Sequence, residues 1–168
     1  MMRFIGAALL LCGCGCFGLS LAAAQKRERY MLQRLIGALQ EMEWELKFRM
    51  TELPELCRIA GCAAGGILKQ VFLELAGKLD AGEVTDISGS LNAILNGREL
   101  PRRVRKNMRQ LGRSLGRFDL EGQLQGLQTV RMQCRKDLQA MEENSAERLR
   151  SYRTLALCVG AALVVLFL

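Results

Sequence analysis

The chain has 168 residues, half of them apolar, and carries a net charge of +7 without a histidine. This length allows one domain of ordinary size with flanking segments. The absence of histidine removes the usual proton shuttle at neutral pH and the commonest metal ligand, which argues against catalysis that depends on either.

Aromatic residues make up 5% of the chain, and long polar-apolar alternation is absent. Apolar residues instead recur at three- and four-residue spacing, which is typical of amphipathic helices. The sequence therefore predicts an all-α fold. We expect a roughly six-helix antiparallel bundle whose first and last helices extend into membrane anchors.

The N-terminal segment, residues 4–24, is an uncharged run of 21 residues. As a helix it is about 31 Å long, enough to cross a hydrocarbon core of about 30 Å. Lys26, Arg27 and Arg29 follow it, whereas only Arg3 precedes it. The positive-inside rule then places the following residues in the cytoplasm, and we predict a retained transmembrane segment over residues 1–24.

An alternative interpretation is that this segment is a signal peptide. Small residues at 22–24 before Gln25 fit a cleavage site, and the stretch 11–14 is a degenerate lipoprotein box. The chain would then be an exported or lipid-anchored surface protein of unknown role.

Residues 25–153 are predicted to form a cytoplasmic helical bundle domain, in which short connections join amphipathic helices. The first helix is expected to stop near Thr51 and to have an apolar face formed by Leu32, Leu35, Ile36, Leu39, Met42, Leu46 and Met50. The remaining boundaries are predicted from turn and helix-start signals at Pro54, 65–66, 80–82, 96–97 and Pro101, with each proline in a first turn.

The last helix is expected to begin after Asp119, whose side chain can cap it, and to continue without a proline to the end. Arg148, Arg150 and Arg153 precede residues 154–168, which carry no side-chain charge. This segment is about 22 Å long as a helix, and we predict it to be a second membrane segment. The positive-inside rule again places the middle domain in the cytoplasm.

Catalytic, cofactor and metal sites are not predicted, so the chain is not expected to be an enzyme. Cys57, Cys62 and Cys134 fall on predicted core faces, where cysteine behaves as a small hydrophobe, and a reducing compartment is consistent with this. Glu41, Glu43 and Glu45 are interpreted as solvent-side or flanking charges. No small-molecule substrate is expected.

The charge excess is concentrated between Arg98 and Arg117, where eight basic residues accompany one acidic residue. Such a face can bind an acidic protein, anionic lipid headgroups or nucleic acid, or it can simply be solvated. Nucleic acid is not expected, because no aromatic residues interleave with the cations to stack bases. The candidate partner- or lipid-binding residues are Arg102, Arg103, Arg105, Lys106, Arg109 and Arg113.

Two stretches resemble the signature regions of the stage III sporulation protein AB family of endospore-forming bacteria. They are LQEMEWELKF at 39–48 with TELPEL at 51–56, and LGRSLGRFDLEGQ at 111–123. In the second, Gly112 and Gly116 are expected to end the fifth helix through left-handed backbone, and Asp119 to cap the sixth with Gln123 bonded to the same turn. Docking of a partner is the alternative role for this turn.

The resemblance implies a membrane-anchored helical domain similar to the cytoplasmic domains of the platform protein of type II secretion and type IV pilus machines. It further implies a subunit of the channel apparatus between mother cell and forespore, located in the mother-cell membrane around the forespore. A secretion-type ATPase of the same apparatus and other channel subunits are the implied partners.

Overall fold

The computed structural model describes the backbone of residues 2–116 and 119–167, and the side chains of residues 23–116 and 119–143. Within these limits the chain forms six α-helices and no strand. The helices are α1 (Met2–Arg49), α2 (Leu53–Ala64), α3 (Gly66–Asp80), α4 (Ile87–Asn96), α5 (Arg102–Ser114) and α6 (Leu120–Phe167). The predicted all-α class and the number of helices are confirmed over this part of the chain.

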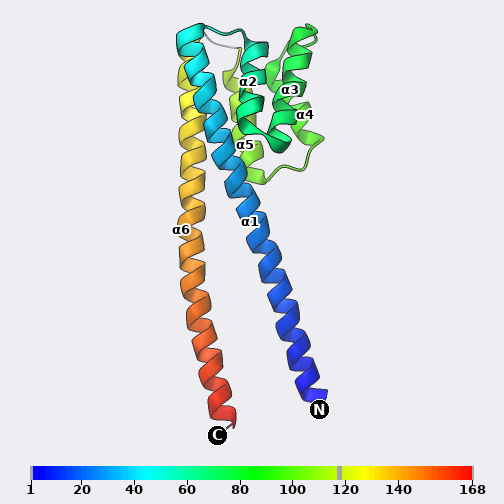
Figure 1. Cartoon of the computed structure of the whole chain (residues 1–168), viewed down its shortest axis with the longest axis vertical. Helices are drawn as coiled ribbons and strands as arrows, with labels where there is room; N and C mark the ends of the chain where they lie inside the picture. The colour runs from blue at the N-terminus through cyan, green and yellow to red at the C-terminus, as the bar shows by residue number, and fades with distance from the viewer. Residues whose placement is uncertain (1, 117–118, 168) are drawn as a thin grey trace.

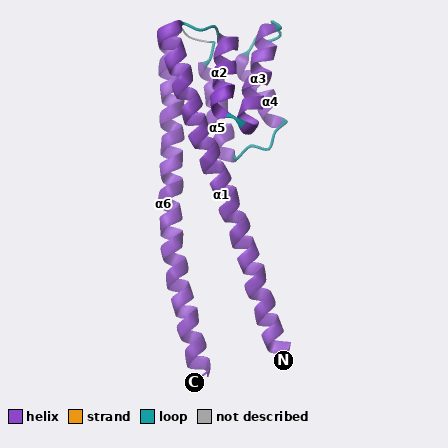
Figure 2. Ribbon diagram, viewed as in Figure 1, coloured by secondary structure: helices purple, strands orange, loops and turns teal. Residues whose placement is uncertain are grey.

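The molecule consists of two long helices and a cluster of four short ones (Figure 1). α1 and α6 lie side by side near the top of the view and run in opposite directions, and α2–α5 pack beside them at that end. Successive helices alternate in direction, and the connections between the short helices are brief (Figure 2). Both long helices continue beyond the cluster, so their outer ends lie at the same end of the molecule. We call the opposite end the apex.

One hydrophobic core joins the six helices. α1 contributes Leu32, Leu35 and Leu39, and α3 contributes Phe72, all of them fully buried. The other helices add fully buried Leu56, Leu95, Met108, Leu127, Val130 and Cys134. Because the core-facing residues of each helix recur every three or four positions, the predicted apolar faces account for most of this core.

Two ion pairs also hold α1 to α6. Arg29 lies 2.7 Å from Glu142, and Arg131 lies 3.1 Å from Glu43. Arg29 is separated from Glu43 by 14 residues, about 21 Å of helix, so the two contacts fix the long helices at two levels.

Three expectations from the sequence are wrong in detail. Met50 is not a core residue, because α1 ends at Arg49 and Met50 turns out of the helix with φ +50° and a side chain 73% exposed. Cys62 is exposed rather than on a core face. Glu45 is only 6% exposed and accepts a 2.8 Å hydrogen bond from Thr51 Oγ1, so it is not a solvent-side charge.

Of the helices, as far as the structure describes them, none has both the length and the apolar composition needed to cross a membrane. The predicted membrane segments, residues 1–24 and 154–168, lie almost entirely outside the described side chains, and they stay predictions.

Candidate functional site

α5 separates apolar and basic residues more sharply than any other described helix. Val104, Met108 and Leu111 are fully buried against the neighbouring helices. The opposite side carries cations at spacings of one, three or four residues, so they share one face. We call these residues the basic stripe; they are Arg102, Arg105, Lys106, Arg109 and Arg113.

α1 helps to position the start of α5. Pro101 precedes the helix and makes no side-chain cap, and it is the residue before α5 rather than part of the first turn as predicted. Instead, the Arg103 amide donates a 3.3 Å hydrogen bond to Glu28 Oε1 of α1. A carboxylate at this end also interacts favourably with the helix dipole. The contact holds the N-terminus of α5 against α1.

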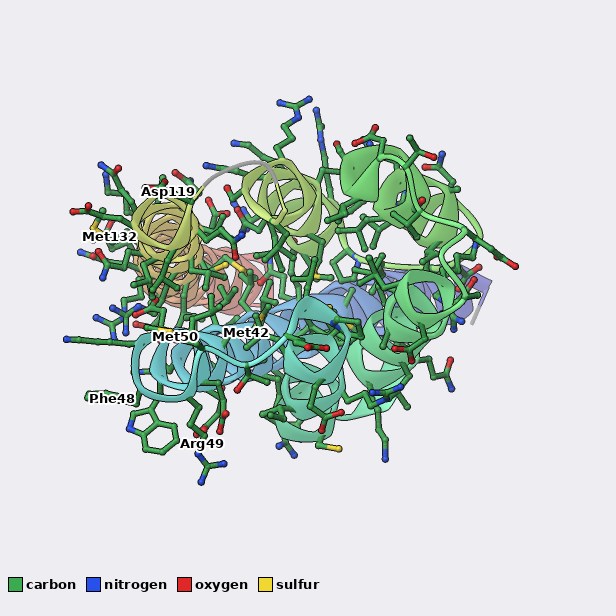
Figure 3. All side chains as sticks on the ribbon, turned by 90° about the horizontal axis from the view of Figure 1, so that it is seen from above. Met42, Phe48, Arg49, Met50, Asp119 and Met132 are labelled. Atoms are coloured by element: carbon green, nitrogen blue, oxygen red, sulfur yellow. The ribbon has the colours of Figure 1, made fainter. Side chains whose placement is uncertain are left out.

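The six candidate cations do not occupy equivalent positions. Arg102, Lys106, Arg109 and Arg113 are exposed, whereas Arg103 and Arg105 are half-buried. The stripe borders a shallow groove together with Leu100 and Gln110, and Arg103 does not line it. Seen along the long axis, nitrogen-tipped side chains project from α5 away from the bundle (Figure 3).

Two arginines of the stripe also brace the connection between α4 and α5. Arg105 Nη2 donates a 3.0 Å hydrogen bond to the Arg98 carbonyl, and Arg109 Nη2 donates one of 3.1 Å to Asn96 Oδ1. These two side chains therefore have a structural role. Lys106 and Arg113, which make no such contact in the described part of the chain, can be substituted without disturbing it.

The described side chains provide no counter-charge for the basic stripe. Among the described side chains, no carboxylate lies within 4.0 Å of any of its cations or of Arg103. Arg98, just before the helix, differs because it forms a 2.8 Å ion pair with Glu74 of α3. The positive potential along α5 is therefore not neutralised within the described structure.

The signature turn between α5 and α6 is built by backbone and packing. Gly116 has φ +71°, a left-handed conformation that favours glycine. Gly112 lies inside α5 rather than ending it, and a Cβ there would lie 2.9 Å from Leu91 Cδ2 of α4. Asp119 Oδ1 accepts a 3.2 Å hydrogen bond from the Gly122 amide at the start of α6. Gln123 lines a small cleft at the apex with Met50 and other residues.

Burial shifts the pKa values of several titratable groups in the core. Burial raises the pKa of the Cys57 and Cys134 thiols to about 12, and Asp137 adds to the effect at Cys134. Burial also raises the pKa of Glu43, while Arg131 and Arg135 oppose this rise. The two thiols are therefore protonated and poorly nucleophilic at neutral pH.

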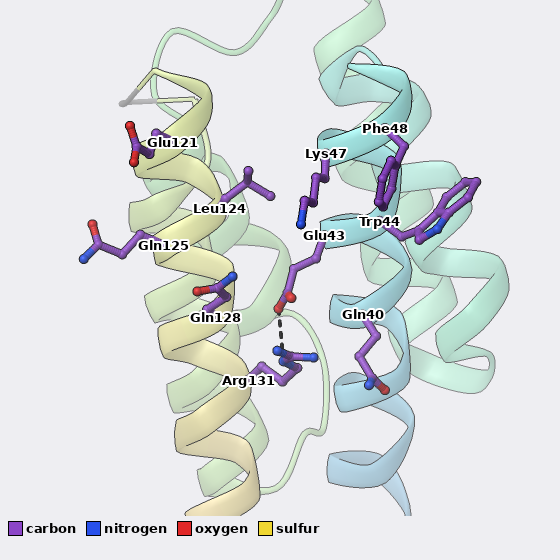
Figure 4. A pocket seen from close by; sticks show the side chains of 10 residues that line it. All are labelled: Gln40, Glu43, Trp44, Lys47, Phe48, Glu121, Leu124, Gln125, Gln128 and Arg131. Carbon is purple, nitrogen blue, oxygen red and sulfur yellow. Dashed lines mark ion pairs between the residues drawn. The ribbon is translucent and has the colours of Figure 1, made fainter.

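A second surface feature, which the sequence pattern did not predict, lies between α1 and α6. A groove there is lined on one side by Trp44, Lys47 and Phe48, and on the other by Leu124 and Gln128 (Figure 4). Trp44 and Phe48 lie four residues apart, so they share a helix face, and this spacing was the available signal. The predicted core face of this helix does not include the two aromatic residues, and both are exposed.

The model of the family described as stage III sporulation protein AB matches residues 3–168 of the chain. No curated protein and no solved structure matches the chain. The match covers both stretches that suggested this family and, apart from Met2, all six helices.

Proposed function

The chain belongs to the stage III sporulation protein AB family, and from this membership we propose that it is a non-enzymatic platform subunit of the sporulation channel apparatus. In this role it is anchored in the mother-cell membrane around the forespore, with residues 25–153 in the cytoplasm. The basic stripe docks an acidic surface of the secretion-type ATPase of the same apparatus.

The observation that carries this proposal is the absence of counter-charges along α5. The stripe extends from Arg102 to Arg113, about 16 Å along the helix. Because its cations form no ion pairs among the described residues, a partner carboxylate can form a new ion pair with Lys106 or Arg113 without breaking an existing ion pair. Complementary charge of this kind speeds association and gives specificity.

The direction of the stripe favours a protein partner over lipid headgroups. α5 runs along the long axis of the molecule, beside α1 (Figure 1). If both chain ends enter one membrane, the stripe is oriented along the membrane normal and only its Arg102 end approaches the headgroups. A flat anionic surface would then meet few of these cations, whereas a protein alongside the bundle would meet all of them.

The test is a charge reversal that leaves the fold intact. In the variant Lys106→Glu/Arg113→Glu, we expect the full chain in nanodiscs to bind the purified ATPase at least about tenfold more weakly, equivalent to about 1.4 kcal/mol. The matched control is Lys69→Glu/Lys136→Glu, which makes the same change in net charge at exposed residues of α3 and α6. The control should bind as the wild type does. Equal binding by both variants would reject the stripe as the docking surface.

A further inference from the structure

The basic stripe and its neighbour Gln110 form two ridges along α5. Side chains four residues apart make a ridge on the surface of a helix, and the space between two ridges is a groove. The shallow groove beside α5 is bordered by two ridges of this kind. They are formed by Arg102, Lys106 and Gln110, and by Arg105, Arg109 and Arg113. Every member of the two ridges except Gln110 is therefore a cation.

This groove belongs to a single helix. Apart from Leu100 in the preceding loop, the described residues that line it are all part of α5. The groove between α1 and α6 differs, because two helices and charges of both signs line it. Two helices pack by placing a ridge of one in a groove of the other. The ridges of α5 therefore present a surface that fits a helix of a partner.

The four exposed cations of α5 form one line. Arg102, Lys106, Arg109 and Arg113 are exposed and follow each other at spacings of four, three and four residues. Along the helix these spacings correspond to rises of about 6, 4.5 and 6 Å. A second α-helix with carboxylates at the same spacings matches all four cations in either direction, because the spacings are the same from both ends. An extended segment places the side chains of one face about 6.7 Å apart, so it loses register along the line.

The sign of the charge determines the chemistry of the partner. Among the described side chains, no carboxylate lies within 4.0 Å of these cations. Arg105 and Arg109 each use one nitrogen to hold the α4–α5 connection, and an arginine side chain has five N–H donors, so both retain donors for a partner. A second copy of α5 laid on the stripe would bring cations together, whereas carboxylates would pair with them.

We propose that the basic stripe recognises an acidic α-helix of the docked ATPase, an inference that rests on the proposed function. The helix lies along α5 for about three turns, with one ridge in the groove and carboxylates opposite the four exposed cations. Recognition then depends on where the carboxylates lie on the partner helix as well as on their number. An acidic loop, or a helix with the same charge spread around it, makes fewer of these ion pairs at once.

Three labelled synthetic peptides of the same composition, each with four glutamates, test this dependence on spacing. In the striped helix the glutamates lie at spacings of four, three and four residues, and in the dispersed helix they lie around the circumference. The third peptide is the striped sequence with D-alanine at two positions, which prevents helix formation. Circular dichroism verifies the conformation of each peptide before use.

The peptides are titrated by fluorescence anisotropy onto the full chain in zwitterionic nanodiscs at low salt, where exposed ion pairs are screened least. We expect the striped helix to bind at least about fivefold more tightly than each of the other two, because several weak ion pairs form together. Equal binding of the striped and dispersed helices would overturn the proposal, since the stripe would then attract acidic chains without selecting a spacing. Equal binding of the striped and non-helical peptides would overturn it as well.

Charge swaps test which cation meets which carboxylate. Lys106 is an inner member of the line and Arg113 an outer one, whichever way the partner runs. Lys106→Glu should prefer, by at least about threefold, a striped helix with lysine at an inner position over one with lysine at an outer position. Arg113→Glu should show the reverse preference. The two variants have equal net charge, as do the two peptides, so each variant is the matched control of the other. The same preference in both variants would overturn the proposal.

The purified ATPase separates recognition of a helix from the docking function. If the ATPase requires the stripe but the striped helix is not preferred, the ATPase docks there through another element and the acidic helix is rejected. If the striped helix is preferred but the ATPase binds the Lys106→Glu/Arg113→Glu variant as it binds the wild type, the docking function is rejected while the stripe still recognises an acidic helix. Displacement of the striped helix by anionic lipid in the nanodiscs would assign the stripe to headgroups and overturn a protein helix as its occupant.

Discussion

Gly126 of α6 lies close to Ser114 of α5. A Cβ added to Gly126 would lie 2.5 Å from the Ser114 Cβ, and a short rigid side chain cannot move away from such a contact. Gly77 of α3 has no atom within 4 Å of the corresponding position. The two helical glycines therefore differ in what an added methyl group would meet.

We expect Gly77→Ala to raise the free energy of unfolding by about 0.5–1 kcal/mol, because alanine is the better helix former. Gly126→Ala gains the same term but forces α5 and α6 apart, at a cost of about 1–3 kcal/mol, so it should be destabilising. Chemical denaturation followed by circular dichroism measures both. Adding Ser114→Gly to Gly126→Ala should recover part of the loss, and additive effects would contradict the predicted contact.

The buried thiols predict a dependence of stability on pH. Cys57 and Cys134 have pKa values of about 12 in the folded chain, raised from an ordinary value of 9.0. Between these values the unfolded chain releases thiol protons that the folded chain retains. The stabilisation is complete below about pH 9, and it should be lost progressively as the pH rises toward 12. In Cys57→Ala/Cys134→Ala this decline of the unfolding free energy should be shallower, and an identical slope would contradict the prediction.

Individual residues also show where sequence patterns succeed and fail. Leu32, Leu35 and Leu39 are buried as their spacing predicts, because a helical period fixes which side chains share a face. The same period also predicts Met50 on the core face, but α1 ends at Arg49, so Met50 is no longer helical. Periodicity cannot locate a helix end to one residue, and at this position that error moves a side chain from the core to the surface.

At the scale of elements, α5 depends on α1 for its cap. Its first turn contains Arg102 and Arg103, which are unfavourable at the positive end of the helix dipole, and no acidic residue of its own. Glu28 supplies the missing acceptor from a position 75 residues earlier in the chain. α4, by contrast, is capped locally by Asp86, which accepts hydrogen bonds from the Ser88 and Gly89 amides.

We expect Glu28→Ala to lower the free energy of unfolding by about 0.5–2 kcal/mol, as loss of a helix cap does. Glu28→Gln should cost less, because the amide oxygen still accepts the bond while the negative charge is lost. Asp86→Ala is the reference for a local cap and should cost a similar amount. Denaturation curves of the three variants provide the measurement, and a neutral Glu28→Ala would mean that water satisfies the Arg103 amide equally well.

Only the local features of the candidate site could be predicted from the sequence. The basic residues of α5 and their helical face could be predicted, because both follow from spacing within one short segment. That Arg105 and Arg109 brace the α4–α5 connection could not, because it depends on how the loop folds back. The Glu28 contact and the groove between α1 and α6 join segments far apart in sequence, and no local pattern specifies such contacts.

At the scale of the whole molecule, the outer ends of α1 and α6 lie at the same end. If both enter one membrane, the whole helical domain lies on one side of it. Ala81, Gly82 and Glu83 in the turn after α3 are exposed and suit insertion of a site for a specific protease. If the domain is cytoplasmic, the inserted site should be cut in inverted vesicles and protected in intact protoplasts. Immunoblotting reads the result. Cleavage in protoplasts would contradict the proposed location and favour export.

The neighbourhood of Met50 and Leu120, which line the same cleft at the apex, has a topological consequence. The chain leaves α1 and enters α6 at nearly the same place, so α2–α5 form an insertion within a long helical hairpin. Replacing residues 51–119 by a short linker should therefore leave the hairpin able to close. The four short helices are then a unit that can be replaced without altering α1 and α6.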